Sequence, residues 1–273
     1  MKLILIIVLV LVLSGCSAEE MKLEKDIYEY TEICEVTKTD IKTTSDNPTK
    51  VVFDKDNQLY IIDEAGDYYL SGEYEGNIQI DVEDKIVHLI LDNVEMQSIN
   101  GPVIYVKSAS KVVITVPEGT KSILKDSTDY MGYEDTPSCI FSQDNLTING
   151  EGNLQVYGYY KDAIRTKDVL RILNVTMDVS SKGVGLRGND GVMAKNANLN
   201  IQCEGTGIYT EKENKENKGF VDLYGGTIRI VSGKYGIDCA QNVYIFECIG
   251  EIFGTAKDII CSGEEYIEEG CLE

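Results

Sequence analysis

Apolar and polar residues alternate over short segments along most of the chain, and the alternation recurs with a nearly fixed period. A small residue followed by an aliphatic one opens each repeat at positions 139, 163, 185, 207, 236 and 258. Successive repeats begin 24, 22, 22, 29 and 22 residues apart, and the long interval contains a charged run of seven residues, 211–217. Removing that insertion restores the period of 22. Alternation predicts strands, and a fixed period predicts a repeat architecture.

Each repeat contains two further alternating segments, for example 146–148 and 154–156, and Gly, Asn or Asp residues separate them. Three short strands per period of about 22 residues predict an all-β fold, a parallel β-helix with three strands in each rung. The aliphatic residues at the second position of each repeat should stack as one inward ladder: Ile140, Ile164, Leu186, Ile208, Ile237 and Ile259. An antiparallel β-sandwich is the competing fold, but a sandwich has no reason to keep one period over five intervals.

The part of the chain before the regular repeats, residues 51–116, is also rich in short strands. Its rungs are less regular, as expected at a capping end. Residues 117–138 then interrupt the coil. This long loop is a candidate site, because loops on a rigid scaffold often carry function. It carries acidic and tyrosine side chains: Asp126, Asp129, Tyr130, Tyr133, Glu134 and Asp135.

The N-terminus predicts export. Lys2 precedes an apolar run over residues 3–13, which is shorter than the roughly 20 residues of a membrane span and is typical of a signal peptide. Leu13-Ser14-Gly15-Cys16 resembles a bacterial lipobox, in which Cys16 is lipidated; the alternative is an ordinary signal peptide cleaved nearby. We expect a lipoprotein signal peptide over residues 1–16, a flexible tether over 17–47 and one β-helix domain over 48–273. The expected location is the extracellular face of the cell membrane, through a lipid anchor.

The charge balance restricts the partners. The chain has 25 basic and 46 acidic residues, a net charge of −21, which argues against binding to nucleic acid or anionic lipid. Clustered carboxylates suit calcium. The single histidine, His88, lies in a predicted strand and cannot form a metal cluster alone. Cys239 and Cys261 share one inward offset in adjacent rungs, so either a disulfide or two buried thiols is compatible with the spacing.

One set of stacked acids is a candidate metal site. Asp144, Asp168 and Asp190 each lie five residues after the start of a repeat, so they should stack about 4.8 Å apart. Carboxylates at that spacing repel unless a cation or protons intervene. A calcium ion held between the rungs would satisfy them. The alternative is a row of solvated turn residues that point away from one another.

A second set is a candidate ligand-binding face. The third position of each repeat should point outward, and it holds Phe141, Arg165, Arg187, Tyr209 and Asp238. Stacked arginines can bind carboxylates or hydroxyls, and aromatic rings can stack on sugars. Tyr157, Tyr159 and Tyr160 should lie beside this row. The alternative is that Arg165 only pairs with a neighbouring acid.

Four segments together resemble a known family: GDYYLSGEY at 66–74, VVITVPEGT at 112–120, IFSQDNLTINGEG at 140–152 and YGGTIRI at 224–230. They are similar to the bacterial carbohydrate-binding domain-containing proteins of clostridial type, which are distantly like pectate lyases. The resemblance covers roughly residues 51–260. It implies a right-handed parallel β-helix that binds cellulose-like or pectin-like polysaccharide together with calcium.

The chain departs from that family at the starts of the rungs. Members usually carry Gly-Asp-Gly-Ile there, whereas Val184, Thr206 and Tyr235 replace the acid in this sequence. Asp162 keeps the acid and joins the candidate metal ligands. If those acids bind metal in relatives, this chain has lost some of the sites.

The sequence thus predicts a non-catalytic surface lipoprotein that binds polysaccharide with calcium. A calcium-dependent polysaccharide lyase is one alternative, because calcium acidifies the proton beside a uronate carboxyl and Arg165 or Arg187 could act as the base. A structural or adhesion protein without affinity for glycans is the other. Because the surface is acidic, binding of an acidic glycan should require calcium bridges or local contact with the arginines.

Overall fold

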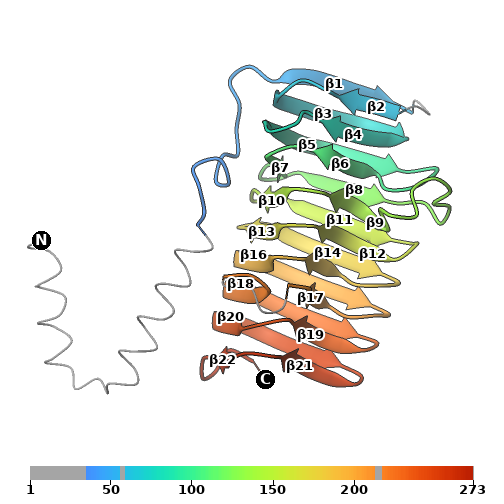
Figure 1. Ribbon diagram of the computed structural model, residues 1–273. Coiled ribbons are helices and arrows are strands. Elements are labelled where there is room, and N and C mark those ends of the chain that lie inside the picture. The colour runs from blue at the N-terminus through green and yellow to red at the C-terminus, as the bar shows by residue number, and fades with distance from the viewer. Residues whose placement is uncertain (1–34, 56–58, 213–216, 273) are drawn as a thin grey trace, which may run out of the picture. The chain divides into compact units, whose positions relative to one another are not determined.

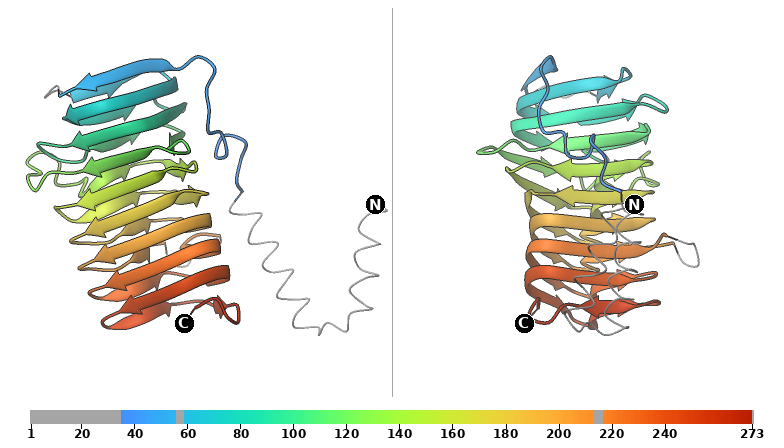
Figure 2. Two further views of the ribbon diagram at one scale, coloured as in Figure 1. Left: turned by 180° about the vertical axis from the view of Figure 1, so that it is seen from behind. Right: turned by 90° about the vertical axis from the view of Figure 1, so that its left-hand side faces the viewer.

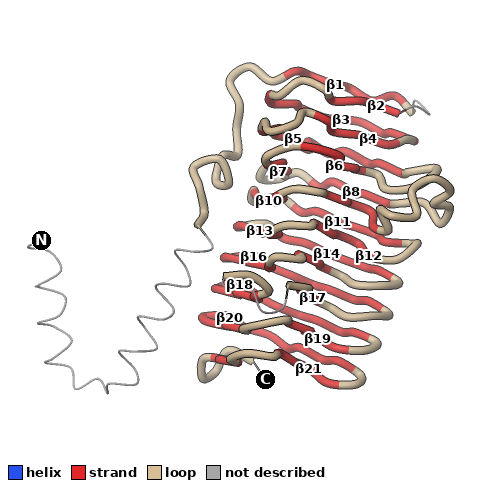
Figure 3. The backbone as a smooth tube through the Cα atoms, in the orientation of Figure 1, coloured by secondary structure: helices blue, strands red, loops and turns tan. Residues whose placement is uncertain are grey.

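The computed structural model describes residues 35–55, 59–212 and 217–272. Residues Lys38–Glu273 form one compact unit, and every regular element among the described residues is a β-strand (Figures 1 and 3). The described part of the chain contains no helix long and apolar enough to cross a membrane. The signal segment 1–16, including Cys16, and most of the expected tether lie outside the described residues.

One wall of the coil is a nine-stranded parallel sheet. Its strands follow one another down the stack from the N-terminal end, each contributed by the next rung, as Figure 2 shows from behind and from the side. In order they are β2 (Leu59–Ile62), β4 (Asn77–Asp81), β6 (Ile104–Ser108), β9 (Ser138–Ser142), β12 (Asp162–Thr166), β15 (Leu186–Gly188), β17 (Ile208–Thr210), β19 (Tyr235–Cys239) and β21 (Lys257–Cys261).

The other two walls belong to one thirteen-stranded sheet that forks. Long strands span both walls, and pairs of short strands stack on their two halves; Leu170 of β13 and Met177 of β14, for example, stack on Val192 and Leu199 of β16. The strands are β1 (Thr49–Asp54), β3 (Gly66–Glu75), β5 (Ile86–Gln97), β7 (Lys111–Thr115), β8 (Lys121–Lys125), β10 (Asn145–Asn149), β11 (Asn153–Gly158), β13 (Val169–Leu173), β14 (Thr176–Ser181), β16 (Gly191–Cys203), β18 (Phe220–Ser232), β20 (Val243–Gly254) and β22 (Glu265–Ile267).

The register confirms the predicted right-handed parallel β-helix and its inward ladder. Ile140 pairs with Ile164, which pairs with Leu186, and the same row continues through Ile208 and Ile237 to Ile259. All six side chains are buried. The row also extends upward to Ile104 and Ile78, so the less regular rungs share the same core. Burial of apolar side chains between stacked rungs is the dominant stabilising contribution.

The corner between the second and third walls requires a left-handed backbone. Asn93, Asn174 and Asn196 have φ angles of 52°, 58° and 51° there, and Glu247 has 51°. Asparagine tolerates this conformation better than most residues with a side chain, which explains the recurrent asparagines between strand segments. One such residue in a rung turns the chain without breaking the stack.

Residues 38–47, which we call the strap, lie against the thirteen-stranded sheet. Asp40 is fully buried, its carboxylate forms an ion pair with Lys111, and Thr147 donates a hydrogen bond to it. Asn149 Nδ2 donates to the carbonyl oxygens of Asp40 (2.7 Å) and Lys42 (2.9 Å). These ten residues therefore belong to the compact unit, which differs from their expected place in a flexible tether. Sequence position alone gave no sign of their partners.

The six described cysteines are free thiols. Cys239 and Cys261 are opposite each other in β19 and β21, as the repeat predicts. The Cys239 sulfur lies 3.1 Å from the backbone oxygens of both Gly219 and Asn242, either of which can accept its single S–H, and burial raises its pKa to about 11. Of the two arrangements that the spacing allowed, the structure has free thiols, with Cys239 buried and Cys261 partly exposed.

Candidate functional site

A row of outward side chains crosses the nine-stranded sheet, and we call it the stripe. The register places its members directly above one another, one from each successive rung. Strand alternation turns this position outward because its neighbours on both sides face the core. The stripe consists of Gln79, Tyr105, Phe141, Arg165, Arg187, Tyr209 and Asp238.

The two arginines at the centre of the stripe are held between aromatic rings. The Cζ atom of Arg165 lies 6.0 Å from the ring centroid of Phe141, and that of Arg187 lies 4.5 Å from the ring centroid of Tyr209. Arg165 Nη2 is 3.9 Å from a carboxylate oxygen of Glu211, and Arg187 Nη1 is 3.5 Å from Asp162. The buried Nε atoms of both arginines have no hydrogen-bond partner among the described residues. Arg165 thus does pair with a neighbouring acid, as the alternative interpretation held. The pairing leaves the Nε–H groups of both arginines without an acceptor in the described part of the chain.

The centre of the stripe is locally cationic, although the whole chain is strongly acidic. Burial and the adjacent Arg187 lower the pKa of Arg165. Burial also lowers the pKa of the nearby Lys167, with Arg165 as the largest electrostatic contributor. Burial is the main cause of both shifts, and the neighbouring positive charges add to it, so an anionic group placed among them would relieve the repulsion.

The aromatic residues that the sequence predicts as sugar-binding residues are not all exposed to solvent. Phe141 is completely buried, with Tyr105 on one side (ring centroids 5.9 Å apart) and Arg165 on the other. The expectation that its ring stacks on a sugar is wrong; the ring supports its neighbours instead. Tyr209 is half-buried under Arg187.

Tyr159 and Tyr160 lie in the turn between β11 and β12, beside the stripe. The ring of Tyr160 stacks on Tyr130 (centroids 4.2 Å apart), and Lys161 lies over it. Tyr159 is 39% exposed and stacks on Tyr157. Among the tyrosines predicted to bind sugar, Tyr159 is therefore the one whose ring is most available to a ligand.

A cleft of about 480 Å³ opens at the upper end of the stripe. The loop over residues 126–137, which we call the cleft loop, forms one side, and strands β4 and β6 form the other. Tyr105 and Tyr133 meet edge to face within it (centroids 6.4 Å apart). The lining residues are Gln79, Tyr105, Lys107, Gly132, Tyr133, Glu134, Asp135 and Thr136. Aromatic surface with a few convergent polar groups is typical of ligand sites.

A buried carboxylate holds the base of the cleft loop. Asp126 is fully buried; it accepts hydrogen bonds from the Tyr130 hydroxyl (2.7 Å) and from the backbone N–H of Tyr159. Burial raises the pKa of Asp126 to about 6, against the lowering effect of these hydrogen bonds. The loop and the turn that carries Tyr159 are thus tied together by one side chain.

The predicted acid stack exists, but its members have separate partners. Asp144 accepts a hydrogen bond from the Ala109 N–H (2.9 Å), Asp168 accepts one from Asn145 (3.2 Å), and Asp190 forms an ion pair with Lys218. Burial, followed by the charges of Asp190 and Asp144, raises the pKa of Asp168, so the three carboxylates do lie within electrostatic reach. Within the described ranges no group of three or more His, Cys, Asp or Glu side chains converges as in a metal site.

Two orphaned acceptors nevertheless lie at the lower end of this stack. Asn189 Oδ1 and Asp190 Oδ1 are both buried and lack a hydrogen-bond partner among the described residues. Oxygen acceptors of this kind fit calcium, which takes carboxylate and amide oxygens. Asp162 fits it poorly, because one carboxylate oxygen accepts from the Val184 N–H (2.9 Å) and the other faces Arg187. If a cation binds the stack, Asp168, Asn189 and Asp190 are the residues to hold it.

Sequence reasoning missed the upper half of the site. Gln79 and Tyr105 precede the regular repeats, so no offset from a rung start identified them as members of the stripe. Their alternation, with Ile78, Ile80, Ile104 and Val106 facing inward, was the available signal. The cleft loop had been singled out, and Tyr133, Glu134 and Asp135 do line the cleft.

Comparisons with known proteins agree with this architecture. The family model of the "Carbohydrate-binding domain-containing protein" matches residues 56–261. A protein of that description from Acetivibrio thermocellus is 32% identical over 250 residues, which cover 84% of this chain and 87% of that protein. A "Probable pectinesterase A" from Aspergillus niger is 30% identical over 108 residues, 37% of this chain and 31% of that protein.

A solved structure is similar over most of the compact unit. It is described as the polysaccharide lyase-like protein from C. thermocellum, in a gadolinium derivative. It has a TM-score of 0.77 and 32% sequence identity, and the match covers 83% of this chain and 99% of that one. With the family model and the close relative, the fold and the sequence lead to one conclusion. The chain belongs to the carbohydrate-binding domain-containing protein family.

Proposed function

We propose that this protein binds an acidic polysaccharide along the stripe, without cleaving it. The observation that carries the proposal is the pair Arg165 and Arg187, which lie against aromatic rings and whose Nη groups are 3.9 Å and 3.5 Å from the carboxylates of Glu211 and Asp162, too far for strong hydrogen bonds. Guanidinium groups bind carboxylates with strong, directional hydrogen bonds. A uronate carboxylate is the group that would fit these donors and reduce the crowding of positive charge.

The cleft extends this surface. From Tyr105 to Tyr209 the stripe crosses four rung intervals, roughly 19 Å at the usual strand spacing. An oligosaccharide that lies along it would reach the ring of Tyr133 at the upper end, while Lys107 and Gln79 offer donors there. Tyr159 offers a further exposed ring beside the stripe.

Calcium is the second part of the proposal. The net charge of −21 repels a polyanion, so binding needs local positive charge or a bridging cation. The orphaned oxygens of Asn189 and Asp190, together with Asp168, would hold the ion. It would supply positive charge to the acidic ligand at the edge of the sheet.

A calcium-dependent lyase is the second candidate, and one specific observation favours it. An arginine serves as a base only if its pKa falls, and burial with the adjacent Arg187 lowers the pKa of Arg165. Nothing in the amino-acid sequence indicated such a shift of the pKa. The lowered value reflects neighbours that also suit simple binding, so the binder remains the main proposal.

We also propose that the chain is a lipoprotein held at the outer face of the cell membrane through Cys16. The apolar run over residues 3–13 and the following Leu-Ser-Gly-Cys support this. Metabolic labelling with a fatty acid, compared between the natural chain and Cys16→Ala, tests it. Label that survives the substitution would refute the anchor.

The binding proposal is tested with residues 21–273, which contain the whole compact unit. Retention on polygalacturonate and on cellulose is measured with calcium and with excess EGTA, while ultraviolet absorbance follows unsaturated product. We expect retention on polygalacturonate that EGTA weakens, with no product. Accumulating product would establish the lyase instead. Absence of retention under all conditions would support the structural or adhesion protein.

Arg187→Ala should weaken retention about tenfold or more, since a hydrogen bond to a charged group contributes about 1.5–3 kcal/mol. Arg229→Ala is the matched control. Arg229 lies exposed on β18 of the other sheet, where it pairs with Glu251, so its loss removes the same charge without touching the stripe. Equal loss in both variants would mean that only net charge matters and that the stripe is not the site.

A further inference from the structure

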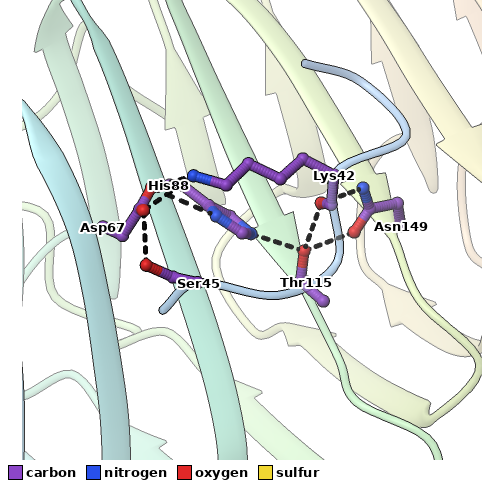
Figure 4. A network of polar contacts seen from close by, with 6 residues as sticks. All are labelled: Lys42, Ser45, Asp67, His88, Thr115 and Asn149. Carbon is purple, nitrogen blue, oxygen red and sulfur yellow. Dashed lines mark hydrogen bonds and ion pairs between the residues drawn. The ribbon is translucent and has the colours of Figure 1, made fainter. Parts of the chain in front are cut away.

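The strap is held by a network that centres on the single histidine of the chain (Figure 4). His88 points outward from β5 yet is only 2% exposed. Its Nε2 lies 2.8 Å from Thr115 Oγ1, and its Nδ1 lies 3.4 Å from Asp67 Oδ1 on β3. From the strap, Lys42 and Ser45 bind the same Asp67 carboxylate.

Hydrogen-bond accounting fixes which nitrogen of His88 carries the proton. Asn149 Nδ2 donates to two strap carbonyls. Thr115 Oγ1 contacts two atoms that can only accept, Asn149 Oδ1 and, at 3.3 Å, the Lys42 carbonyl oxygen, so its single hydroxyl hydrogen is directed to them. Thr115 Oγ1 must then accept from His88 Nε2–H. In the neutral imidazole the other nitrogen, Nδ1, is therefore bare, and it has no hydrogen-bond partner among the described residues.

The bare nitrogen faces an acceptor that the strap already uses. Lys42 Nζ lies 2.8 and 2.7 Å from the two oxygens of Asp67, and Ser45 Oγ donates to one of them (2.6 Å). A second proton on His88 would turn Nδ1 into a donor aimed at Asp67. It would also place a buried positive charge beside Lys42.

We propose that the strap is a proton-sensitive latch, in which protonated His88 and Lys42 of the strap compete for the carboxylate of Asp67, so that acidification releases residues 38–47. The charged groups that act on the imidazole are Asp67 from β3 and Lys42 from the strap, while Thr115 from β7 contributes a neutral contact.

The direction of the pH dependence follows from comparing His88 with the strap docked and with the strap released. Burial under the docked strap lowers the pKa of His88; Asp67 opposes this and Lys42 adds to it. When the strap leaves, water reaches the ring and Lys42 departs, so the pKa of His88 rises toward or above its usual range. Docking is strongest above the titration range of an exposed imidazole, near pH 6.5, and weakens as the pH falls through it. Each unit of difference between the two pKa values changes the docking equilibrium about tenfold.

Release would have two consequences. Ten residues of chain would become free at the N-terminal side of the domain, which adds roughly 30 Å of reach when extended. The outward face around Thr115, Thr147 and Asn149 would also become accessible; these side chains are buried in the docked state. The inference is independent of the proposed glycan site, because the strap lies on the other sheet.

Because the chain has one histidine, NMR of the ¹⁵N-labelled imidazole in residues 21–273 measures the pKa of His88 without overlap from other histidines. The decisive variant is Asp40→Ala, which releases the far end of the strap from Lys111 and Thr147. By charge alone, loss of a carboxylate lowers the pKa of a histidine. The latch predicts the opposite, a rise, because the undocked state becomes populated. Asp81→Ala, which removes the partner of Lys107 on the nine-stranded sheet, should produce no rise.

A second measurement keeps the test independent of folding defects in that variant. Hydrogen exchange of residues 38–47, corrected for intrinsic rates, should increase on going from pH 7.5 to 5.0 in the natural chain. His88→Gln keeps a donor toward Thr115 but cannot take up a proton, so its strap should exchange independently of pH over this range. An equal pH dependence in His88→Gln, or an unchanged or lowered imidazole pKa in folded Asp40→Ala, would overturn the latch.

Discussion

Individual residues in this β-helix face environments that the repeat does not reveal. Gly188 occupies an inward position that Thr166 and Thr210 fill in the adjacent rungs, and a Cβ atom there would lie 1.9 Å from the Gly191 carbonyl oxygen. Asp126 is a carboxylate in a dry environment, with a pKa that burial raises to about 6. Both residues are constrained by their neighbours in space.

Asp126 makes stability depend on pH in a defined direction. Its pKa is higher in the folded state than the ordinary value of 3.8, so the folded protein binds more protons between those values and gains stability as the pH falls from 7 to 4. Asp126→Asn mimics the protonated form and should raise stability at pH 8 by up to about 3 kcal/mol, a difference that disappears near pH 4. Urea denaturation at both values measures it.

Asp135→Asn is the matched control for that prediction, because Asp135 lies exposed on the same loop. It should change stability little at either pH. A stability gain in Asp126→Asn that persists at pH 4 would show that the carboxylate is not the source of the pH dependence.

At the scale of elements, the cleft loop depends on a glycine beneath it. Gly101 has a φ of +75°, and a Cβ atom there would lie 2.6 Å from the ring of Tyr133. Its backbone N–H donates to the Asp129 carbonyl (2.7 Å), which fixes the loop to the turn between β5 and β6. The ring of Tyr133 is therefore positioned by the close approach of two loops.

Gly101→Ala should displace Tyr133 and weaken retention on polygalacturonate, because the added methyl group occupies the place of the ring. Gly119→Ala is the control. Gly119 has nearly the same φ, +74°, but no atom lies within 4 Å of an added Cβ. Both variants carry a backbone cost of about 1 kcal/mol. If the two variants bind the glycan equally well, Tyr133 does not contribute to the site.

At the scale of the whole molecule, a stack of rungs must be closed at both ends. The rings of Phe53 and Tyr74 stack at the upper end (centroids 4.3 Å apart), and Tyr60 meets Phe53 edge to face. At the lower end β22 and the following residues cover the last rung. An open pocket of about 300 Å³ lies at this end, and its lining includes Ile252, Ile259, Ile267 and Leu272.

Ending the chain after residue 262 should therefore uncover Ile252 and Ile259 and leave strand edges unpaired. Exposed edges of parallel strands pair with other chains, so we expect a lower melting temperature and self-association that grows with concentration. Static light scattering measures it. Glu269→Ala, which alters an exposed residue of the tail, should remain like the natural chain; a truncated chain that stays monomeric and equally stable would show that β22 is dispensable.

The sequence by itself determined the period, the inward ladders and the outward position of Arg165 and Arg187. Each of these follows from short-range alternation that every rung repeats, so one rung predicts the next. The same alternation placed Phe141 outward correctly. It did not show that Tyr105 and Arg165 cover the ring, because coverage comes from neighbouring rungs and loops.

Only the tertiary structure decided what lies on top of the coil. Asp40 meets Lys111, 71 residues later, and Asn149, 109 residues later, and nothing periodic in the sequence encodes these contacts. The cleft likewise exists because the loop around Tyr133 settles over Gly101, with neither part of a repeat. The coil can be predicted from the sequence because every rung repeats the same short-range pattern. The strap and the cleft depend on long-range contacts that each occur once.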